Sequence, residues 1–211
     1  MSILVALAVA MIAWSVRRVA QGPLAIMFAG SAAALAAGAA LGLALYPWTD
    51  LPVLGFAVAG GVLVGRRLPP RPMPMLVFLA VLAALDAIQI IAPGPGPGPG
   101  PGPGATGSAA PAWYFYGMLV IDTAWSHTRV GIFDVLLIAA MVEHARRRGL
   151  PFGVGAAPGV LAFVAAGAAV LVFGPLNLPL VPFLFAGWLA TGIVVRITGM
   201  PSQSERKPTA R

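Results

Sequence analysis

The chain has 211 residues, of which 59% are hydrophobic and 9% are charged, and its mean hydropathy is +0.92. A water-soluble domain cannot bury so much apolar surface, so the composition excludes an ordinary soluble protein and indicates a membrane protein with several spans. The formal net charge is +7, but the basic residues cluster between apolar runs, which is typical of membrane-protein loops and not of a nucleic-acid interface. The absence of cysteine excludes disulfides and thiolate chemistry.

Seven apolar runs approach the length of about 20 residues that a helix needs to cross a bilayer. They cover roughly residues 2–16, 24–47, 51–65, 73–92, 129–145, 154–174 and 180–198. Turn-forming or charged segments separate them, such as YPWTD and RRRGLP. We therefore expect an all-α fold, a polytopic transmembrane helix bundle of about seven spans that forms a single membrane domain. Residues 1–72 would hold the first three spans, and residues 73–198 would hold the others.

The basic residues predict how this bundle is oriented. They follow the first, third, fifth and seventh runs, as Arg17 and Arg18, Arg66, Arg67 and Arg71, Arg146 to Arg148, and Arg206, Lys207 and Arg211. Because cytoplasmic loops carry the excess of arginine and lysine, we expect the N-terminus outside and the C-terminus in the cytoplasm. Residues 199–211 would be a basic cytoplasmic tail. The first run has no basic residues before it, which favours a span over a cleaved signal peptide. The expected location is a plasma membrane of the prokaryotic type.

Six Pro-Gly repeats, Pro93 to Gly104, separate the fourth and fifth runs. Their period of two excludes collagen, which needs glycine at every third position. We expect residues 93–112 to form a disordered external loop, for which a neutral repeat expansion is a sufficient explanation. The aromatic segment PAWYFYGMLVIDTAWSH, residues 111–127, suits an interfacial piece that leads into the fifth span.

Two aspartates stand inside apolar runs. Asp86 lies about two-thirds of the way through the fourth run, and Asp134 lies about one and a half turns into the fifth, so the antiparallel spans would bring both to a similar depth near the outer face. An ionisable group inside a span costs several kcal/mol and is a candidate functional residue. Glu143 differs, because it stands four residues before Arg147 and is expected to form an i,i+4 pair.

Paired carboxylates in a site of low dielectric constant suit the chemistry of an aspartyl protease. They share one proton, since both cannot easily ionise. The ionised group draws a proton from water while the protonated group polarises the peptide carbonyl. A buried polar contact between helices, with Asp86 bonded to Gln89 or to the backbone, explains the same spacing without catalysis. Asp122 is a spare candidate, because the sequence does not fix where the fifth span starts.

The order of these motifs resembles the presenilin and signal peptide peptidase family of GxGD-type intramembrane aspartyl proteases, with this chain as a divergent member. LDAIQIIAPGP stands where that family has Tyr-Asp, RVGIFDVLLIAAM where it has Gly-x-Gly-Asp, and LNLPLVPFLFAG where Pro-Ala-Leu opens the last span. The resemblance covers about residues 80–198. The chain departs from the family at Leu85, at Phe133 and at Pro179-Leu180-Val181.

The resemblance implies a catalytic dyad of Asp86 and Asp134, with an active site shaped by Gly131, Phe133, Pro179 and Leu180. It also implies an aspartic endopeptidase that cuts transmembrane or signal-peptide helices, which would enter sideways from the lipid bilayer. No metal, cofactor or nucleic acid is expected, and no HExxH motif is present. Two alternatives stay open: an inactive family member that binds membrane helices, and a small proton-coupled transporter. The lack of an obvious inverted repeat argues against the transporter.

Overall fold

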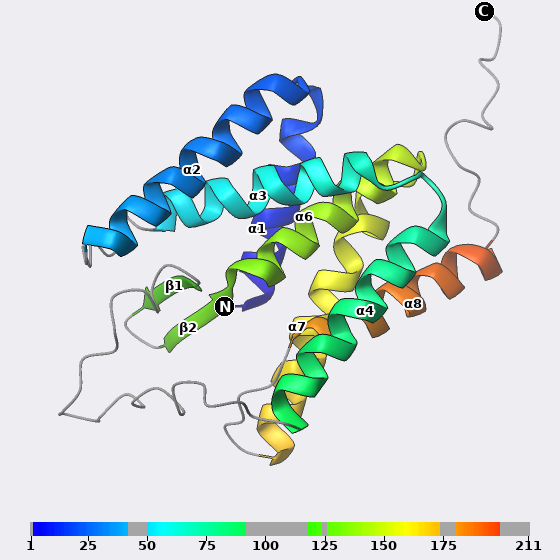
Figure 1. The fold of residues 1–211 in the computed structure, drawn as a ribbon. Helices are drawn as coiled ribbons and strands as arrows, with labels where there is room; N and C mark the ends of the chain where they lie inside the picture. The colour runs from blue at the N-terminus through cyan, green and yellow to red at the C-terminus, as the bar shows by residue number, and fades with distance from the viewer. Residues whose placement is uncertain (1, 42–49, 92–117, 124–125, 174–179, 199–211) are drawn as a thin grey trace, which may run out of the picture.

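A computed structural model describes residues 2–41, 50–91, 118–123, 126–173 and 180–198 of the chain (Figure 1). Seven α-helices lie in these residues: α1 Ser2–Ser15, α2 Gln21–Leu41, α3 Asp50–Arg67, α4 Pro72–Ile91, α6 Ile132–Arg147, α7 Phe152–Phe173 and α8 Val181–Thr198. A short 3-10 helix, η1 Val16–Arg18, follows α1. The helices coincide with the seven apolar runs, and the expected helical fold is confirmed. The Pro-Gly tract and the basic tail lie outside the described residues.

Within the described residues, three helices are long and apolar enough to cross a membrane, by length and composition: α2, α7 and α8. The helical parts Ile3–Ser15 and Pro72–Leu85 are apolar but shorter. Large apolar side chains stand exposed on these helices, for example Ile26 and Ile197 at 74% and 79%. Exposed apolar surface of this kind suits a lipid environment, so the structure supports a membrane protein. The expected seven spans and their orientation stay predictions.

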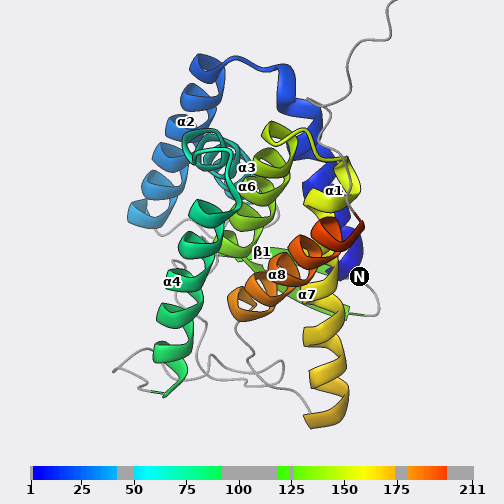
Figure 2. The same ribbon diagram turned by 90° about the vertical axis from the view of Figure 1, so that its right-hand side faces the viewer.

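Helix α6 is the centre of the fold. Every residue from Leu137 to Ala145 is buried, including the polar Glu143 and His144. The helix packs against α3, α7 and α1, while α2 covers the other side of α3 and α4 packs against α8 (Figures 1 and 2). The contact between α3 and α6 therefore joins the N-terminal three helices to the later ones.

Glycines allow α3 and α6 to approach closely. A Cβ atom added at Gly61 would lie 2.2 Å from the carbonyl oxygen of Leu136, and one at Gly65 would lie 2.7 Å from that of Ala140. These two glycines are four residues apart and face α6 on successive turns. Small residues at this spacing let helix backbones meet in membranes, where packing replaces the hydrophobic effect as the driving force. The Gly-x-x-x-Gly pattern in α3 thus sets the distance between the two helices.

A β-hairpin stands directly before α6. Strands β1, Met118–Thr123, and β2, Ser126–Gly131, pair antiparallel with Met118 opposite Gly131 and Thr123 opposite Ser126. Strand β1 contains Val120, Ile121 and Thr123, and β2 contains Thr128 and Val130; such β-branched residues favour extended structure. The hairpin replaces the interfacial piece expected before the fifth span, and it takes up the first residues of the run expected at 129–145. Helix α6 therefore begins at Ile132.

Replacing Gly61 with alanine is expected to destabilise the protein by about 1–3 kcal/mol, because the added methyl group forces α3 and α6 apart. Thermal unfolding in detergent micelles measures the effect. Gly30→Ala in α2 is the matched control, since nothing lies within 4 Å of a Cβ atom there. Equal unfolding temperatures for the two variants would contradict the close α3–α6 contact.

Candidate functional site

Asp134 lies in the first turn of α6, at the junction between β2 and the helix. This position is nearer the helix end than the one and a half turns expected from the apolar run, because the hairpin delays the start of the helix. An acidic group in the first turn is stabilised by the partial positive charge of the helix N-terminus. The start of α6 therefore explains how the chain holds a carboxylate at this point.

Gly131 gives the Asp134 carboxylate its space. A Cβ atom added at Gly131 would lie 2.8 Å from Oδ2 of Asp134, so the carboxylate folds back over the residue before the helix. The backbone of Gly131 has φ −61° and ψ 141°, an extended conformation that any residue adopts. Glycine is needed here for room and not for its backbone freedom.

The other expected site residues are placed separately. Phe133 is 68% exposed, so its ring points away from the core. Leu180 is buried, and its carbonyl accepts a hydrogen bond of 3.0 Å from the Leu184 amide in the first turn of α8. Pro179 lies outside the described residues. The structure thus brings Gly131 and Asp134 together, and it places Leu180 in the core at the start of α8.

Asp86 lies in α4, and its side chain is outside the described part of the structure. Helix α4 packs against α8, and the substantial helix contacts of the described residues do not include a pairing of α4 with α6. Helix α8 in turn packs against α7, which packs against α6. The dyad of Asp86 and Asp134 stays a prediction.

At the other end of α6, a buried carboxylate binds two arginines. The side chain of Glu143 is fully buried and accepts hydrogen bonds from Arg146, at 2.6 Å from both Nε and Nη2, and from Nε of Arg66 at 3.2 Å. The predicted pairing of Glu143 with Arg147 is wrong. Arg146 lies within reach on the same helix, and Arg66 arrives from the end of α3. The contact therefore joins α6 to α3 in addition to stabilising α6 itself.

Arg147 binds the C-terminal end of α3 instead. Its Nη1 donates to the carbonyl oxygens of Gly65 at 3.3 Å, Arg66, and Leu68 at 2.7 Å. The last carbonyls of a helix have no amide donors in the following turn, so a cation at this place supplies hydrogen bonds and interacts favourably with the helix dipole. Nη1 of Arg66 donates to the Val19 carbonyl at 2.9 Å. Val19 lies between η1 and α2, so this hydrogen bond attaches the segment that joins α1 to α2 to the end of α3.

His144 completes this cluster and was not identified from the sequence as a functional residue. Its Nε2 lies 3.0 Å from the Arg71 carbonyl oxygen, so Nε2 carries the hydrogen and donates it. Its ring meets the Trp188 indole edge-to-face, with ring centroids 5.8 Å apart. Nδ1 is buried and has no hydrogen-bond partner among the described residues. The useful sequence signal is a Glu-His pair at the buried end of an apolar helix, beside three arginines.

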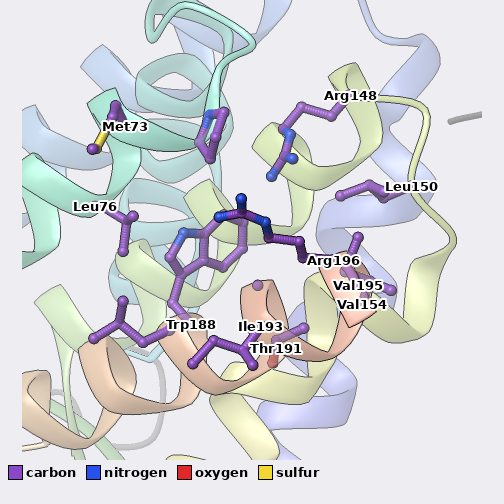
Figure 3. Close-up of a pocket in the computed structure, with 13 residues that line it drawn as sticks. Met73, Leu76, Arg148, Leu150, Val154, Trp188, Thr191, Ile193, Val195 and Arg196 are labelled. Carbon is purple, nitrogen blue, oxygen red and sulfur yellow. The ribbon is translucent and has the colours of Figure 1, made fainter. Parts of the chain in front are cut away.

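A pocket of about 560 Å³ opens next to this cluster (Figure 3). It lies between the start of α4, the end of α6, the start of α7 and the second half of α8. Trp188 forms part of its wall, while Arg148 and Arg196 reach toward the same region beside that indole. The sequence did not indicate this pocket, because its walls come from four separate segments.

Comparison with protein-family models, with curated proteins and with solved structures finds no match for this chain. The resemblance to the presenilin and signal peptide peptidase family rests on the sequence motifs, and the activity that it implies is a proposal.

Replacing Glu143 with glutamine is expected to destabilise the protein by about 3 kcal/mol, because it removes the buried negative charge that binds Arg66 and Arg146. Thermal unfolding in micelles at low and high salt provides the measurement. The loss should change little with salt, since a buried pair is poorly screened. Arg18→Gln is the control, because Arg18 is an exposed basic residue in η1. A Glu143→Gln protein as stable as this control would refute the role of the cluster.

Proposed function

We propose that the chain is an intramembrane aspartyl protease of the signal peptide peptidase type, with Asp86 and Asp134 as its catalytic dyad. The observation that carries the proposal is the junction at Gly131, where a β-strand ends beside a carboxylate at the start of the most buried helix. This junction offers an extended backbone and an acidic group at the same place. An aspartyl protease uses a carboxylate to activate water, and a strand edge can hold a substrate in extended form.

The hairpin supports the handling of a helical substrate. A transmembrane helix hides its peptide bonds in its own hydrogen bonds, so it must unwind before it can be cut. In the described residues the sheet has two strands, and β1 lies against α3. The outer edge of β2 can accept an extended peptide through main-chain hydrogen bonds, as in other cases of strand addition. A substrate strand held there would run past Gly131 toward Asp134.

The proposed chemistry uses both carboxylates as a unit. One carboxylate, ionised, takes a proton from the water that attacks the peptide carbon, while the other, protonated, donates a hydrogen bond to the peptide carbonyl. The proton taken from water then passes to the leaving amine as the C–N bond breaks, which restores the pair. Because the pair shares a proton, neither role is assigned to one residue. Asp86 has to approach Asp134 from the second half of α4.

The cluster at the other end of α6 supports the proposed topology. Contacts of Arg66, Arg147 and His144 join the C-terminal ends of α1, α3 and α6 to the start of α4. Among the described residues, Arg66, Arg71 and Arg147, which predict the cytoplasmic side, thus lie at one end of the molecule. Asp134 lies at the opposite end of α6, toward the proposed outer face. We infer a multi-pass protein of about seven spans in a prokaryotic plasma membrane, with its N-terminus outside and its substrates among transmembrane or signal-peptide helices.

Replacing either aspartate of the dyad with asparagine is expected to lower the rate of cleavage of a model transmembrane peptide by at least about 100-fold, because each variant removes a proton donor or acceptor. Purified protein in micelles or nanodiscs, with the products identified by mass spectrometry, gives the measurement. Asp50→Asn, at the start of α3, is the control and should cleave like the unchanged protein. Full activity in Asp86→Asn or Asp134→Asn contradicts the dyad. No cleavage of any of several peptides by the unchanged protein would favour the inactive helix-binding protein or the transporter.

Replacing Gly131 with alanine is expected to lower cleavage by about tenfold or more, since a displacement of about 1 Å at a reacting group can have effects of that size. The new methyl group would meet Oδ2 of Asp134 and shift it, while the backbone conformation permits alanine. Gly153→Ala in α7 is the matched control, because nothing lies within 4 Å of a Cβ atom there. If both variants have the activity of the unchanged protein, the space over Gly131 is not used in catalysis.

A further inference from the structure

The pocket beside Trp188 has apolar walls and two positively charged groups. Leu76 of α4 and Ile193 and Leu189 of α8 give it apolar walls. Arg148, directly after α6, and Arg196, near the end of α8, add two guanidinium groups from different segments (Figure 3). A ligand that fits would carry an apolar body and an anionic group.

The positive charges of Arg148 and Arg196 are not neutralised by an acidic side chain of the described residues. In the described residues, neither guanidinium forms a hydrogen bond or an ion pair within the protein. The acidic side chain described at this end of the molecule, Glu143, is already bound to Arg66 and Arg146. Burial lowers the pKa of the Arg148 guanidinium from its usual value, which reflects the loss of water around it. An arginine nevertheless stays protonated at neutral pH.

Two helices begin at the rim of the pocket and strengthen its preference for anions. Pro72 and Met73 at the start of α4 line it, as does Val154 in the first turn of α7. Helix N-termini carry a partial positive charge. These ends add to the positive potential set by Arg148 and Arg196.

The position of the pocket favours a membrane lipid as the anionic ligand. Helices α7 and α8 are both candidate membrane spans, and the pocket lies at the end where the basic residues gather. This end corresponds to the boundary between the hydrocarbon layer and the cytoplasmic headgroups, where basic pockets between spans bind lipid headgroups. We propose that the pocket binds one anionic phospholipid, with its phosphate at Arg148 and Arg196 and an acyl chain along Leu76, Leu189 and Ile193.

The test measures lipid binding directly. The full-length protein in neutral micelles is titrated with short-chain phosphatidylglycerol, and the bound lipid is counted by native mass spectrometry. Phosphatidylcholine and inorganic phosphate serve as separate probes. The protein should bind one phosphatidylglycerol molecule more tightly than phosphatidylcholine, and millimolar inorganic phosphate should not displace it. Arg148→Gln and Arg196→Gln should each weaken binding about fivefold, and together about 25-fold, as expected for the loss of a surface arginine near an anionic lipid.

Arg18→Gln is the matched control for charge, because it removes an exposed arginine from the same end of the molecule. It should leave binding within about twofold, and the unfolding temperature of each variant shows whether the fold is intact. Asp134→Asn should also bind normally, since the lipid site does not depend on the proposed protease activity. Three results would overturn the proposal: equal binding of the two lipids, equal weakening by Arg18→Gln, or displacement by inorganic phosphate, which would assign the arginines to a free anion.

A second variant tests the apolar part without changing charge. Gly192 lines the pocket, and nothing lies within 4 Å of a Cβ atom added there. Gly192→Phe should fill the space of the acyl chain and weaken phosphatidylglycerol binding at least about tenfold, the loss expected when a ligand's apolar contacts are blocked. Gly167→Phe in α7 is the control, because Gly167 is also open and lies outside the pocket. Unchanged binding in Gly192→Phe would contradict the placement of the lipid.

Discussion

The fully buried carboxylate of Glu143 binds Arg66 from α3 and Arg146 from its own helix, and this contact fixes α6 relative to α3. Taking a carboxylate out of water is costly unless its charge and lone pairs are satisfied, so the position of Glu143 tolerates little displacement. The glycines of α3 bring the backbone of α6 close along the length of the contact. The ion pairs of Glu143 at one end of α6 and the close packing along the α3 glycines thus together hold α6, the most buried helix, in place.

The two ends of α6 consequently serve different purposes. The helix has 16 residues, which corresponds to about 24 Å at 1.5 Å per residue. In the proposed topology α6 is a span, and this length would bring its two ends toward opposite faces of a hydrocarbon layer of about 30 Å. The basic end contacts α3, α4 and the lipid pocket through His144, Arg147 and Arg148. The other end carries Asp134 beside the hairpin. In the proposed topology, the contacts at the basic end would set the depth of the Asp134 carboxylate in the membrane.

The helices could be predicted well from the sequence, and their contacts could not. Apolar runs mark helices wherever the lipid or the core selects them, so the expected run 73–92 agrees closely with α4. The hairpin was missed because the aromatic residues of segment 111–127 favoured an interfacial piece, whereas the strand in MLVIDT depends on its pairing with β2. The partner of Glu143 was missed because Arg66 lies 77 residues away in sequence. Local spacing favoured Arg147, but that residue instead donates to backbone carbonyls at the end of α3. The pocket at Trp188 was missed for the same reason, since four segments form it.

The most direct test of the central claim is whether residues 86 and 134 meet in the folded protein. The chain contains no cysteine, so the pair Asp86→Cys and Asp134→Cys can be oxidised without competing thiols. A protease site inserted within residues 93–112 lets a cross-link hold the two fragments together on a denaturing gel. The pair should cross-link with a short bifunctional thiol reagent. A pair of Ala84→Cys with Asp134→Cys should not, because Ala84 points about 160° away from Asp86 around an ideal helix, at 100° per residue. Equal cross-linking of both pairs, or none in either, would contradict an aspartyl dyad in this protein.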